Sequence, residues 1–345
     1  MIHSNFGKIG FFGGSFLFLA ALVLYALHEG QIPVPLHAVW YEIGREAGLS
    51  FGAPPRPEET AVFWYIRMPR VIVALLAGAG LAAAGAVMQG VFANALADPG
   101  MIGVSSGASF GAVLCIAFGY SSFSLYSMPV FALAGAVFAL TVTAALTYQK
   151  GDIPPMSLLL AGVAVGMFLS AVTSGILTFI NEYKLKEFLF WMVGGLDYRR
   201  WEHVAIAAGP VLAGLAFLTA MGRHLNVLSL GEEEARALGM NLLLFRGIFL
   251  LAASLMTAAA VCVSGMIGFV GLVIPHVTRI LLGPDHRVLI PAAALLGGIF
   301  LLFCDTLGRV IMPPMEIRAG IVTALVGAPY FLYLLRRMRR QGGVL

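Results

Sequence analysis

The sequence predicts an all-α integral membrane protein with about ten transmembrane helices, and its composition and the spacing of its apolar runs predict that fold class. Of the 345 residues, 60% are hydrophobic and 11% are charged, and the mean hydropathy is +0.92. A water-soluble domain carries about 25% charged residues because its surface faces water. We therefore expect lipid to cover most of this surface.

Apolar runs long enough to cross a bilayer recur along the chain, since a membrane-spanning helix needs about 20 apolar residues. The runs are 9–28, 68–92, 101–118, 128–148, 155–180, 201–222, 243–264, 269–283, 288–307 and 319–335. An even number of spans places both termini on the same side. The short run 269–283 requires other helices to shield it from lipid.

Polar segments connect these runs. Residues 29–66 form the longest, with several prolines, and residues 223–242 form a polar insert with helical character. Residues 181–200 surround an apolar piece, Phe188–Leu196, that is typical of a short interfacial helix. We interpret residues 1–345 as a single transmembrane domain that ends in a tail, 336–345.

Charge gives the orientation. With both termini inside, 11 of the 21 Lys and Arg residues lie on the inner side and 10 on the outer side. The densest cluster is Arg336, Arg337, Arg339 and Arg340, and clustered arginines beside a span favour the cytoplasmic face. We therefore expect both termini in the cytoplasm and the chain in the plasma (inner) membrane. A net charge of +4 and a cluster beside a span suit a membrane surface better than nucleic acid.

Three cysteines, Cys115, Cys262 and Cys304, lie inside apolar runs and form no CxxC pair. We expect packed thiols, with no disulfide, metal site or cofactor. A membrane-embedded enzyme would need a convergent cluster such as HExxH, and an ion-coupled secondary transporter would need ionisable residues near the middle of several spans. The sequence has no such cluster, and it has almost no ionisable residues near the middle of its spans, so neither class is favoured. It also has no GxxxxGK[ST] loop for ATP.

The segment Arg223–Asn241 carries helix signals. Ser229 is a suitable N-cap, three acids (Glu232–Glu234) occupy the following turn, and Gly239 is a suitable C-cap. The spacing predicts a short amphipathic helix over 230–238. This helix is either a surface that binds a partner or an ordinary solvated helix in a loop, and the residues alone leave both open.

Further motifs follow in order between residues 60 and 335. They are RMPRVIVALLAGAGL (67–81), GAVMQG (85–90), NALADPG (94–100), GVSSGA (103–108), LLLAGV (158–163), GMIGFVGLVIPHVTR (265–279), GPDHR (283–287) and GIVTALVGAP (320–329). With the segment 223–241, these motifs resemble the FecCD-type permeases, the membrane subunits of iron-siderophore, haem and cobalamin ABC importers.

The resemblance implies the type II ABC importer permease fold and a homodimer or pseudo-dimer with one translocation path. It implies two ATP-binding cassette subunits and a periplasmic or lipoprotein substrate-binding protein as partners. The chain would then be a transport subunit and not an enzyme, because a partner chain hydrolyses ATP. Ferric siderophore is the first expected substrate, with haem and cobalamin as alternatives.

The resemblance also implies roles for individual residues. Those expected to couple to the ATPase are Leu228, Ser229, Leu230, Gly231, Glu232, Glu233, Ala235, Arg236, Leu238 and Gly239. Those expected at the cytoplasmic gate are Asn94, Leu96, Pro155 and Met156. Those expected to dock the binding protein are Arg67, Arg70 and Arg309, for which membrane-edge anchoring is the alternative.

Four positions carry further expectations. Asp305 lies four residues before Arg309, which predicts an ion pair on one helix face. His276 invites a haem-ligand interpretation, but Pro-His-x-x-Arg resembles the family at this place, so we expect a structural role. Ala95 replaces the proline of the family pattern NPLADP. Arg318 departs from the pattern ELPxG, and the sequence gives it no role.

Overall fold

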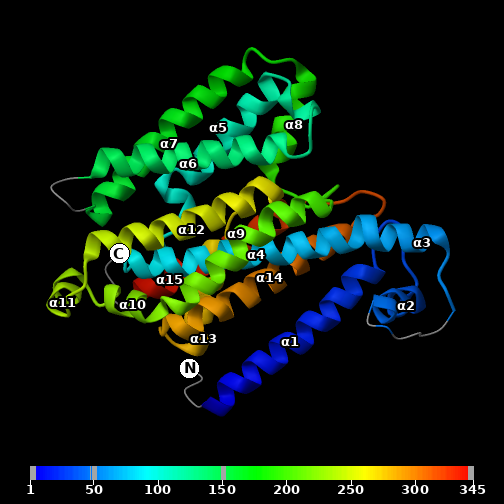
Figure 1. The fold of residues 1–345 in the computed structure, drawn as a ribbon, viewed down its shortest axis with the longest axis horizontal. Coiled ribbons are helices and arrows are strands. Elements are labelled where there is room, and N and C mark those ends of the chain that lie inside the picture. Colours follow the sequence, from blue (N-terminus) through cyan, green and yellow to red (C-terminus); the bar gives the residue numbers. More distant parts are fainter. Residues whose placement is uncertain (1–4, 47, 49–52, 149–152, 341–345) are drawn as a thin grey trace.

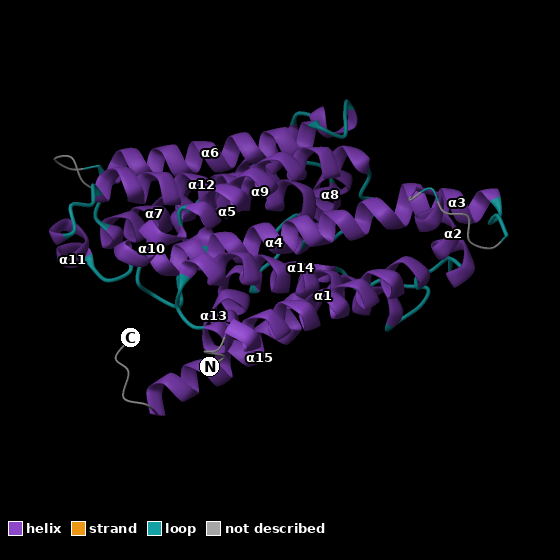
Figure 2. Ribbon diagram, turned by 60° about the horizontal axis from the view of Figure 1, so that its bottom comes forward, coloured by secondary structure: helices purple, strands orange, loops and turns teal. Residues whose placement is uncertain are grey.

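The computed structural model describes residues 5–46, 48, 53–148 and 153–340, and the described chain consists of helices joined by loops and turns (Figure 2). The predicted all-α membrane fold is confirmed. Seven helices are long and apolar enough to cross a membrane, and three shorter apolar helices accompany them within the described residues.

These long and shorter apolar helices agree with the predicted runs to within a few residues. They are α1 (Asn5–His28), α4 (Met68–Val91), α5 (Val104–Ala117), α6 (Ser127–Thr147), α7 (Pro155–Leu177), α9 (Trp201–Ala220), α12 (Leu242–Ser264), α13 (Val270–Leu282), α14 (His286–Val310) and α15 (Ala319–Arg340). Helix α15 continues to Arg340, beyond the predicted end at 335, so the first part of the expected tail is helical and residues 341–345 lie outside the described chain.

Short helices occupy the connections. They are α2 (Leu36–Glu46), α3 (Pro57–Val62), the π-helical turn η1 (Phe63–Arg67), the 3-10 turns η2 (Pro99–Ile102) and η3 (Tyr120–Ser122), α8 (Glu182–Val193), α10 (Gly222–Leu228) and α11 (Glu232–Ala237). The predicted interfacial helix is α8, which begins earlier than expected because Asn181 accepts a hydrogen bond from the Lys184 N–H at 3.0 Å and caps it.

Helix α4 lies at the centre of the bundle, packed against α14, α12, α13 and α9 (Figure 1). Its sequence is rich in Gly and Ala, and small residues allow helix backbones to approach closely. A methyl group at Gly78 would overlap the carbonyl oxygen of Gly297 in α14, and one at Gly85 would overlap that of Gly271 in α13. These glycines therefore allow α4 to pack closely against α14 and α13.

A second group of helices, α5, α6 and α7, lies beside this core (Figure 1). Gly107 of α5 and Gly135 of α6 face each other, and a methyl group on either would overlap the other's carbonyl oxygen. Helix α12 contacts both groups through α4 and α6.

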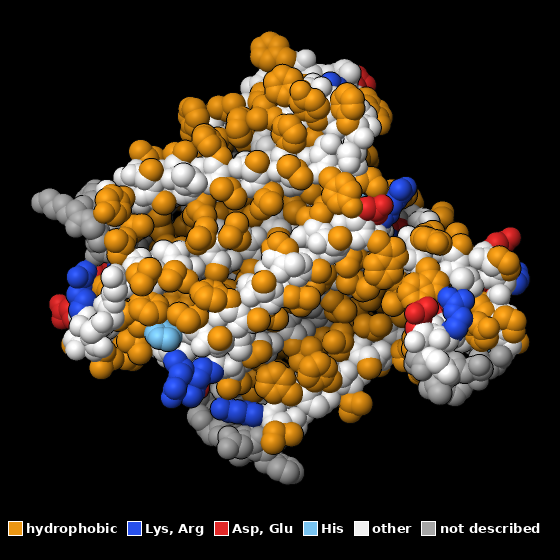
Figure 3. All heavy atoms as spheres, viewed as in Figure 1, with side chains coloured by type: hydrophobic (Ala, Val, Ile, Leu, Met, Phe, Trp, Pro, Cys, Tyr) orange, Lys and Arg blue, Asp and Glu red, His pale blue; other side chains and the backbone are white. Residues whose placement is uncertain are grey.

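The bundle has two distinct ends. Helices α10 and α11 lie at one end, which we call the α11 end, and α2, α3 and α8 lie toward the other, the α2 end (Figure 1). Hydrophobic side chains cover the middle of the face in Figure 3, and most of the charged side chains gather toward the two ends. That distribution suits a protein whose middle is surrounded by lipid.

Candidate functional site

The polar insert at the α11 end folds into two short helices. Helix α11 spans Glu232–Ala237, within the predicted 230–238, and its three acids fill the first turn as expected. The predicted N-cap is wrong. Ser229 ends α10, where its hydroxyl donates to the carbonyl of Asn226 at 2.8 Å, and Gly231 occupies the cap position of α11 instead.

Two glycines set the entry and exit of α11. Gly231 has φ +125° and Gly239 has φ +78°, values that glycine adopts without the steric cost of a side chain. At the exit the Gly239 N–H donates to the Arg236 carbonyl at 2.9 Å, and the Met240 N–H donates to the Ala235 carbonyl at 3.0 Å. Gly239 therefore closes the helix as the sequence predicts.

The outer face of α11 is exposed and mixed in character. Ala235 is buried against the bundle, whereas Leu230 and Leu238 are 62% and 67% exposed. Glu233 is also exposed. We call Leu230, Glu233 and Leu238 the coupling face, because the sequence analysis expects ATPase coupling here, and that role stays a prediction.

Asn226 of α10, a residue that the sequence analysis missed, holds this segment to the bundle. Its Oδ1 accepts from the His286 N–H at 2.8 Å and lies 2.7 Å from His286 Nδ1, and its Nδ2 donates to Asp285 Oδ1 at 2.8 Å. Both partners stand at the start of α14. Three polar contacts to one side chain therefore clamp α10 to α14, and we call this the Asn226 clamp.

Two ion pairs reinforce the α11 end. Glu232 Oε1 of α11 lies 2.5 Å from Nη2 of Arg246, a buried residue of α12. Asp285 Oδ2 lies 2.6 Å from Arg287 Nη2. The hydrogen bond from the Arg287 side chain holds the pKa of Asp285 well below its usual range, so Asp285 is ionised when it accepts from Asn226.

The expected gate residues lie at helix ends. Asn94 and Leu96 are in the loop between α4 and η2, where Asn94 Oδ1 accepts from the Leu96 N–H at 2.8 Å. Pro155 is the first residue of α7 and Met156 follows it, 68% exposed. The Asn94 hydrogen bond forms an Asx turn, which stabilises the loop. Closure of a path by these residues stays a prediction.

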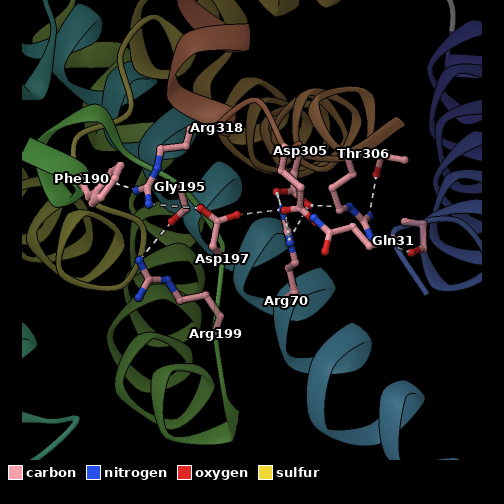
Figure 4. A network of polar contacts seen from close by, with 12 residues as sticks. Gln31, Arg70, Phe190, Gly195, Asp197, Arg199, Asp305, Thr306 and Arg318 are labelled. Atoms are coloured by element: carbon pink, nitrogen blue, oxygen red, sulfur yellow. Dashed lines mark hydrogen bonds and ion pairs between the residues drawn. The ribbon is translucent and has the colours of Figure 1, made fainter. Parts of the chain in front are cut away.

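The strongest cluster of charges lies at the α2 end, around Arg70 of α4 (Figure 4). Its guanidinium donates to both oxygens of Asp305, with Nη2–Oδ1 at 2.8 Å, and to Glu316 Oε2 at 2.8 Å. Asp197 Oδ1 lies 3.3 Å from Arg70 Nη2. One arginine thus joins three acids from distant parts of the chain, which sequence spacing alone does not reveal.

The predicted pair between Asp305 and Arg309 is present, with Oδ2 and Nε 3.3 Å apart. Arg309 also donates from Nη1 to the carbonyls of Ala26 and Glu29, both at 3.2 Å, at the end of α1. Arg309 therefore ties α14 to α1 while it shares Asp305 with Arg70.

Arg318, for which no role was predicted, links the start of α15 to α8. Its Nη1 donates to the Phe190 carbonyl at 2.5 Å, and its guanidinium carbon lies 4.6 Å from the centre of the Phe190 ring. Its Nη2 lies 3.5 Å from Asp197 Oδ2. Arg70, Arg309, Arg318, Asp197, Asp305 and Glu316 form what we call the arginine network, with equal numbers of positive and negative groups.

The three arginines expected to dock a binding protein are buried. Arg67, Arg70 and Arg309 are 5%, 8% and 2% exposed. Arg67 ends the π-helical turn, packs against Gly30 and donates to the Ile32 carbonyl at 3.0 Å. All three contact groups of their own chain and do not form a flat exposed surface. Docking of the binding protein by these arginines stays a prediction.

A cavity of about 860 Å³ opens beside the network. Arg67, Arg70, Asp197, Glu316 and Arg318 line one part of it. The remaining walls come from the loop after α1, the end of α3, the turn η1, α8, the loop before α9 and the first residues of α9. We call it the α2-end cavity.

His276 is within α13, where Nδ1 has no hydrogen-bond partner among the described residues. No group of three or more His, Cys, Asp and Glu side chains in the described chain is placed to hold a metal ion. The structural role expected for His276 stays a prediction.

Comparison with known proteins was made on sequence and on structure. The FecCD transport family matches residues 18–337. The chain is 43% identical over 312 residues to the cobalamin import system permease protein BtuC of Halobacterium salinarum, with 89% of this chain and 80% of that protein covered. It is 41% identical to the hemin transport system permease protein HmuU of Yersinia pestis, with 80% and 83% covered.

Two further relatives span almost the whole chain. One is the uncharacterised ABC transporter permease protein YvrB of Bacillus subtilis, 40% identical over 95% of this chain and 93% of its own. A solved structure described as an inward-facing conformation of a metal-chelate type ABC transporter matches with a TM-score of 0.82 and 33% identity, covering 94% of this chain and 98% of that one. The chain therefore belongs to the FecCD transport family, whose members are permease subunits of type II ABC importers.

Proposed function

We propose that this chain moves a metal chelate, first of all a ferric siderophore, across the inner membrane in a complex with two ATP-binding cassette subunits. A separate binding protein delivers the chelate. The coupling face carries this proposal, because Leu230, Glu233 and Leu238 are exposed on and beside α11. The Glu232–Arg246 pair holds α11 to α12, and the Asn226 clamp holds the neighbouring α10 to α14. A rigidly held, partly apolar surface can transmit movement from a bound ATPase.

The orientation follows from the same face. If α11 contacts the ATPase, the α11 end is cytoplasmic and so are both termini. The α2 end then faces outward, toward the binding protein. Two copies of the chain would enclose one path, and Asn94, Leu96, Pro155 and Met156 would close that path at its cytoplasmic end.

Docking of the binding protein takes a different form from the one that the sequence suggested. Arg67 and Arg70 line the α2-end cavity, whereas Arg309 is buried behind it. An acidic side chain of the partner would have to enter the cavity to meet Arg67, because Arg70 is already surrounded by Asp305, Glu316 and Asp197. Arg309 then supports the site from behind by fixing Asp305.

Haem and cobalamin are the alternative substrates. They are favoured by the names of two relatives, a cobalamin permease at 43% identity and a hemin permease at 41%. Both share with ferric siderophores a metal held in an organic ligand, so the three belong to one chemical class.

Uptake of labelled substrates tests the proposal. A strain lacking the chain should lose uptake of one of three labelled chelates, a ferric siderophore, haem or cobalamin, and the intact gene should restore it. The Glu233→Lys variant should fail to restore it although it reaches the membrane. Uptake of all three chelates at wild-type rates without the chain would reject the proposed function.

A further inference from the structure

The α2-end cavity carries more positive than negative charge. Five arginines line it, Arg67, Arg70, Arg199, Arg200 and Arg318, against three acids, Asp197, Glu202 and Glu316. The arginine network already pairs Arg70 and Arg318 with Asp197 and Glu316. The excess charge therefore rests on the arginines that the network leaves out.

Arg67 and Arg199 have no carboxylate partner. In the described chain no carboxylate oxygen lies within the 4 Å of an ion pair from either guanidinium group. Arg67 donates to the Ile32 carbonyl, and Arg199 donates to the Gly195 carbonyl at 3.1 Å and lies 3.4 Å from His203 Nε2. The Nε atom of each is buried without a hydrogen-bond partner.

Asp197 is the acid that could neutralise Arg199, but both of its oxygens are already used. Oδ1 lies 3.3 Å from Arg70 and Oδ2 lies 3.5 Å from Arg318 (Figure 4). Burial lowers the pKa of Arg199 to about 10, so it remains charged at neutral pH. Arg199 is half-buried and has Asp197 nearby but no carboxylate at ion-pair distance, so an anionic ligand would supply the close partner that it lacks.

The size and walls of the cavity indicate what kind of anion fits. A volume of about 860 Å³ is in the range of sites for organic molecules, about 300–1,000 Å³, and far exceeds a single carboxylate side chain. Aromatic side chains also line it, namely Tyr65, Phe190, Tyr198 and Trp201. Arginines beside aromatic rings suit a large organic anion that has both charged and flat apolar parts.

We propose that the α2-end cavity binds the anionic groups of an organic metal chelate, with Arg199 as the contact that supplies unpaired positive charge, while Arg67 stays available to the binding protein. This inference rests on the proposed transport function and adds the charge of the substrate to it. Arg318 contributes indirectly, because it holds Asp197 away from Arg199.

Direct binding to the permease in lipid nanodiscs, without ATPase or binding protein, tests the inference. The probes are an anionic ferric tricatecholate and an uncharged ferric trihydroxamate of similar size. The wild type should bind the anionic chelate more tightly. Arg199→Gln should weaken its binding about tenfold, as expected for loss of a charged hydrogen-bonding group, and leave the uncharged chelate unaffected.

Two further variants keep the result interpretable. Arg199→Lys retains the charge and should retain preference for the anionic chelate. Arg56→Gln removes an exposed arginine outside the cavity and should change neither affinity, which excludes a general effect of net charge.

Equal binding of both chelates to the wild type, or unchanged binding in Arg199→Gln, would overturn the inference. So would an Arg199→Gln variant that loses affinity for the binding protein but keeps its affinity for the anionic chelate, since the cavity would then receive a protein carboxylate. These results leave the transport function intact, because none of them measures uptake, whereas unchanged uptake of all three chelates in the strain lacking the chain would reject the transport function itself.

Discussion

Asp305 shows how one buried side chain can hold three helices. Its carboxylate accepts from Arg70 of α4 and lies within ion-pair distance of Arg309 on its own helix, α14, while Arg309 reaches the end of α1. Asp305 is 1% exposed. Two buried guanidinium groups therefore depend on one buried negative charge.

Replacing Asp305 with Asn should destabilise the protein by about 3–5 kcal/mol, because it leaves the buried Arg309 without its carboxylate partner and removes one of the three acids around Arg70. Thermal unfolding in detergent measures the effect. Arg287→Gln, which removes an exposed partner of Asp285, is the matched control and should cost about 0–1 kcal/mol. Equal losses in the two variants would mean that Asp305 contributes no more than an exposed pair.

Only ion pairs between residues that are close along the chain could be predicted from the sequence. The Asp305–Arg309 pair spans one helical turn, so it is visible as a four-residue spacing. The contact between Arg70 and Asp305 joins residues 235 positions apart, and only the packing of α4 on α14 brings them together. The role of Arg318 likewise depends on α8, which the spacing of charges could not place.

At the scale of elements, the coupling segment is fixed at two places and exposed between them. The Asn226 clamp holds α10 to α14, and the Glu232–Arg246 pair holds α11 to α12. We expect force on the coupling face to reach α12 and α14 directly.

Replacing Asn226 with Asp should loosen the clamp, because it removes the amide donor to Asp285 and places two carboxylates side by side. We expect ATP hydrolysis by the assembled complex to continue while uptake per ATP falls severalfold. Asn241→Asp is the control, since Asn241 caps α12 and aspartate is an equally good cap. A variant with wild-type uptake per ATP would show that α10 needs no clamp.

Changes on α11 itself should also uncouple transport. Proline cannot adopt the φ of +78° found at Gly239, and Glu233→Lys reverses a charge on the coupling face. Both variants should remain folded but lose substrate-stimulated hydrolysis and uptake. Glu58→Lys makes the same charge change at the α2 end and should be silent toward the ATPase. Unchanged hydrolysis and uptake in both α11 variants would contradict the role of this helix.

Asp285 predicts a pH dependence for the α11 end. Its pKa is lowered in the folded state, chiefly by the Arg287 hydrogen bond, so its stabilising effect is present above the unfolded pKa of about 3.9 and is lost as the pH falls toward the folded pKa. The difference in melting temperature between wild type and Asp285→Asn should be constant from about pH 8 to pH 5 and shrink below about pH 4. A difference that grows on acidification would reverse this assignment.

The elements also show why the cap of α11 was misplaced. Serine is a frequent N-cap, but the chain turns once more after Ser229 because Gly231 adopts φ +125°. The two candidate N-caps, Ser229 and Gly231, lie only two residues apart. The packing of α10 places Ser229 at the end of α10 and leaves Gly231 as the N-cap of α11. At the C-terminal end of α11 no second candidate lies close to Gly239, and this end was predicted correctly.

For the whole molecule, the proposed orientation gives a direct test. A membrane-impermeant maleimide added to intact cells should label Arg56→Cys at the α2 end and leave Gly343→Cys unlabelled. The native thiols of Cys115, Cys262 and Cys304 are buried, so background labelling should be low. Labelling of Gly343→Cys from outside would invert the topology.

Assembly is a separate prediction at this scale. The purified, active complex should contain two copies of this chain and two ATPase subunits. Mass measurement of the intact complex checks the ratio. An active complex with one permease copy would contradict the expected dimer.

The overall fold could be predicted from the sequence because each membrane span is recognised from its own apolar run, without knowledge of its neighbours. Their ends were displaced where charged or polar residues continue a helix, as in α15 beyond residue 335. The α2-end cavity was not accessible, since Asp197, Arg199 and Glu316 lie in connections whose positions depend on the whole bundle.

The glycine contacts of the bundle have a mechanical consequence. Where Gly78 meets Gly297, and Gly107 meets Gly135, backbone touches backbone with no side chain that could change rotamer. Such contacts cannot adapt gradually to sliding, so α4 moves together with α14, and α5 with α6. We therefore expect a transport cycle to rotate two rigid bodies against each other along α12, with the bending in linking segments such as 92–103.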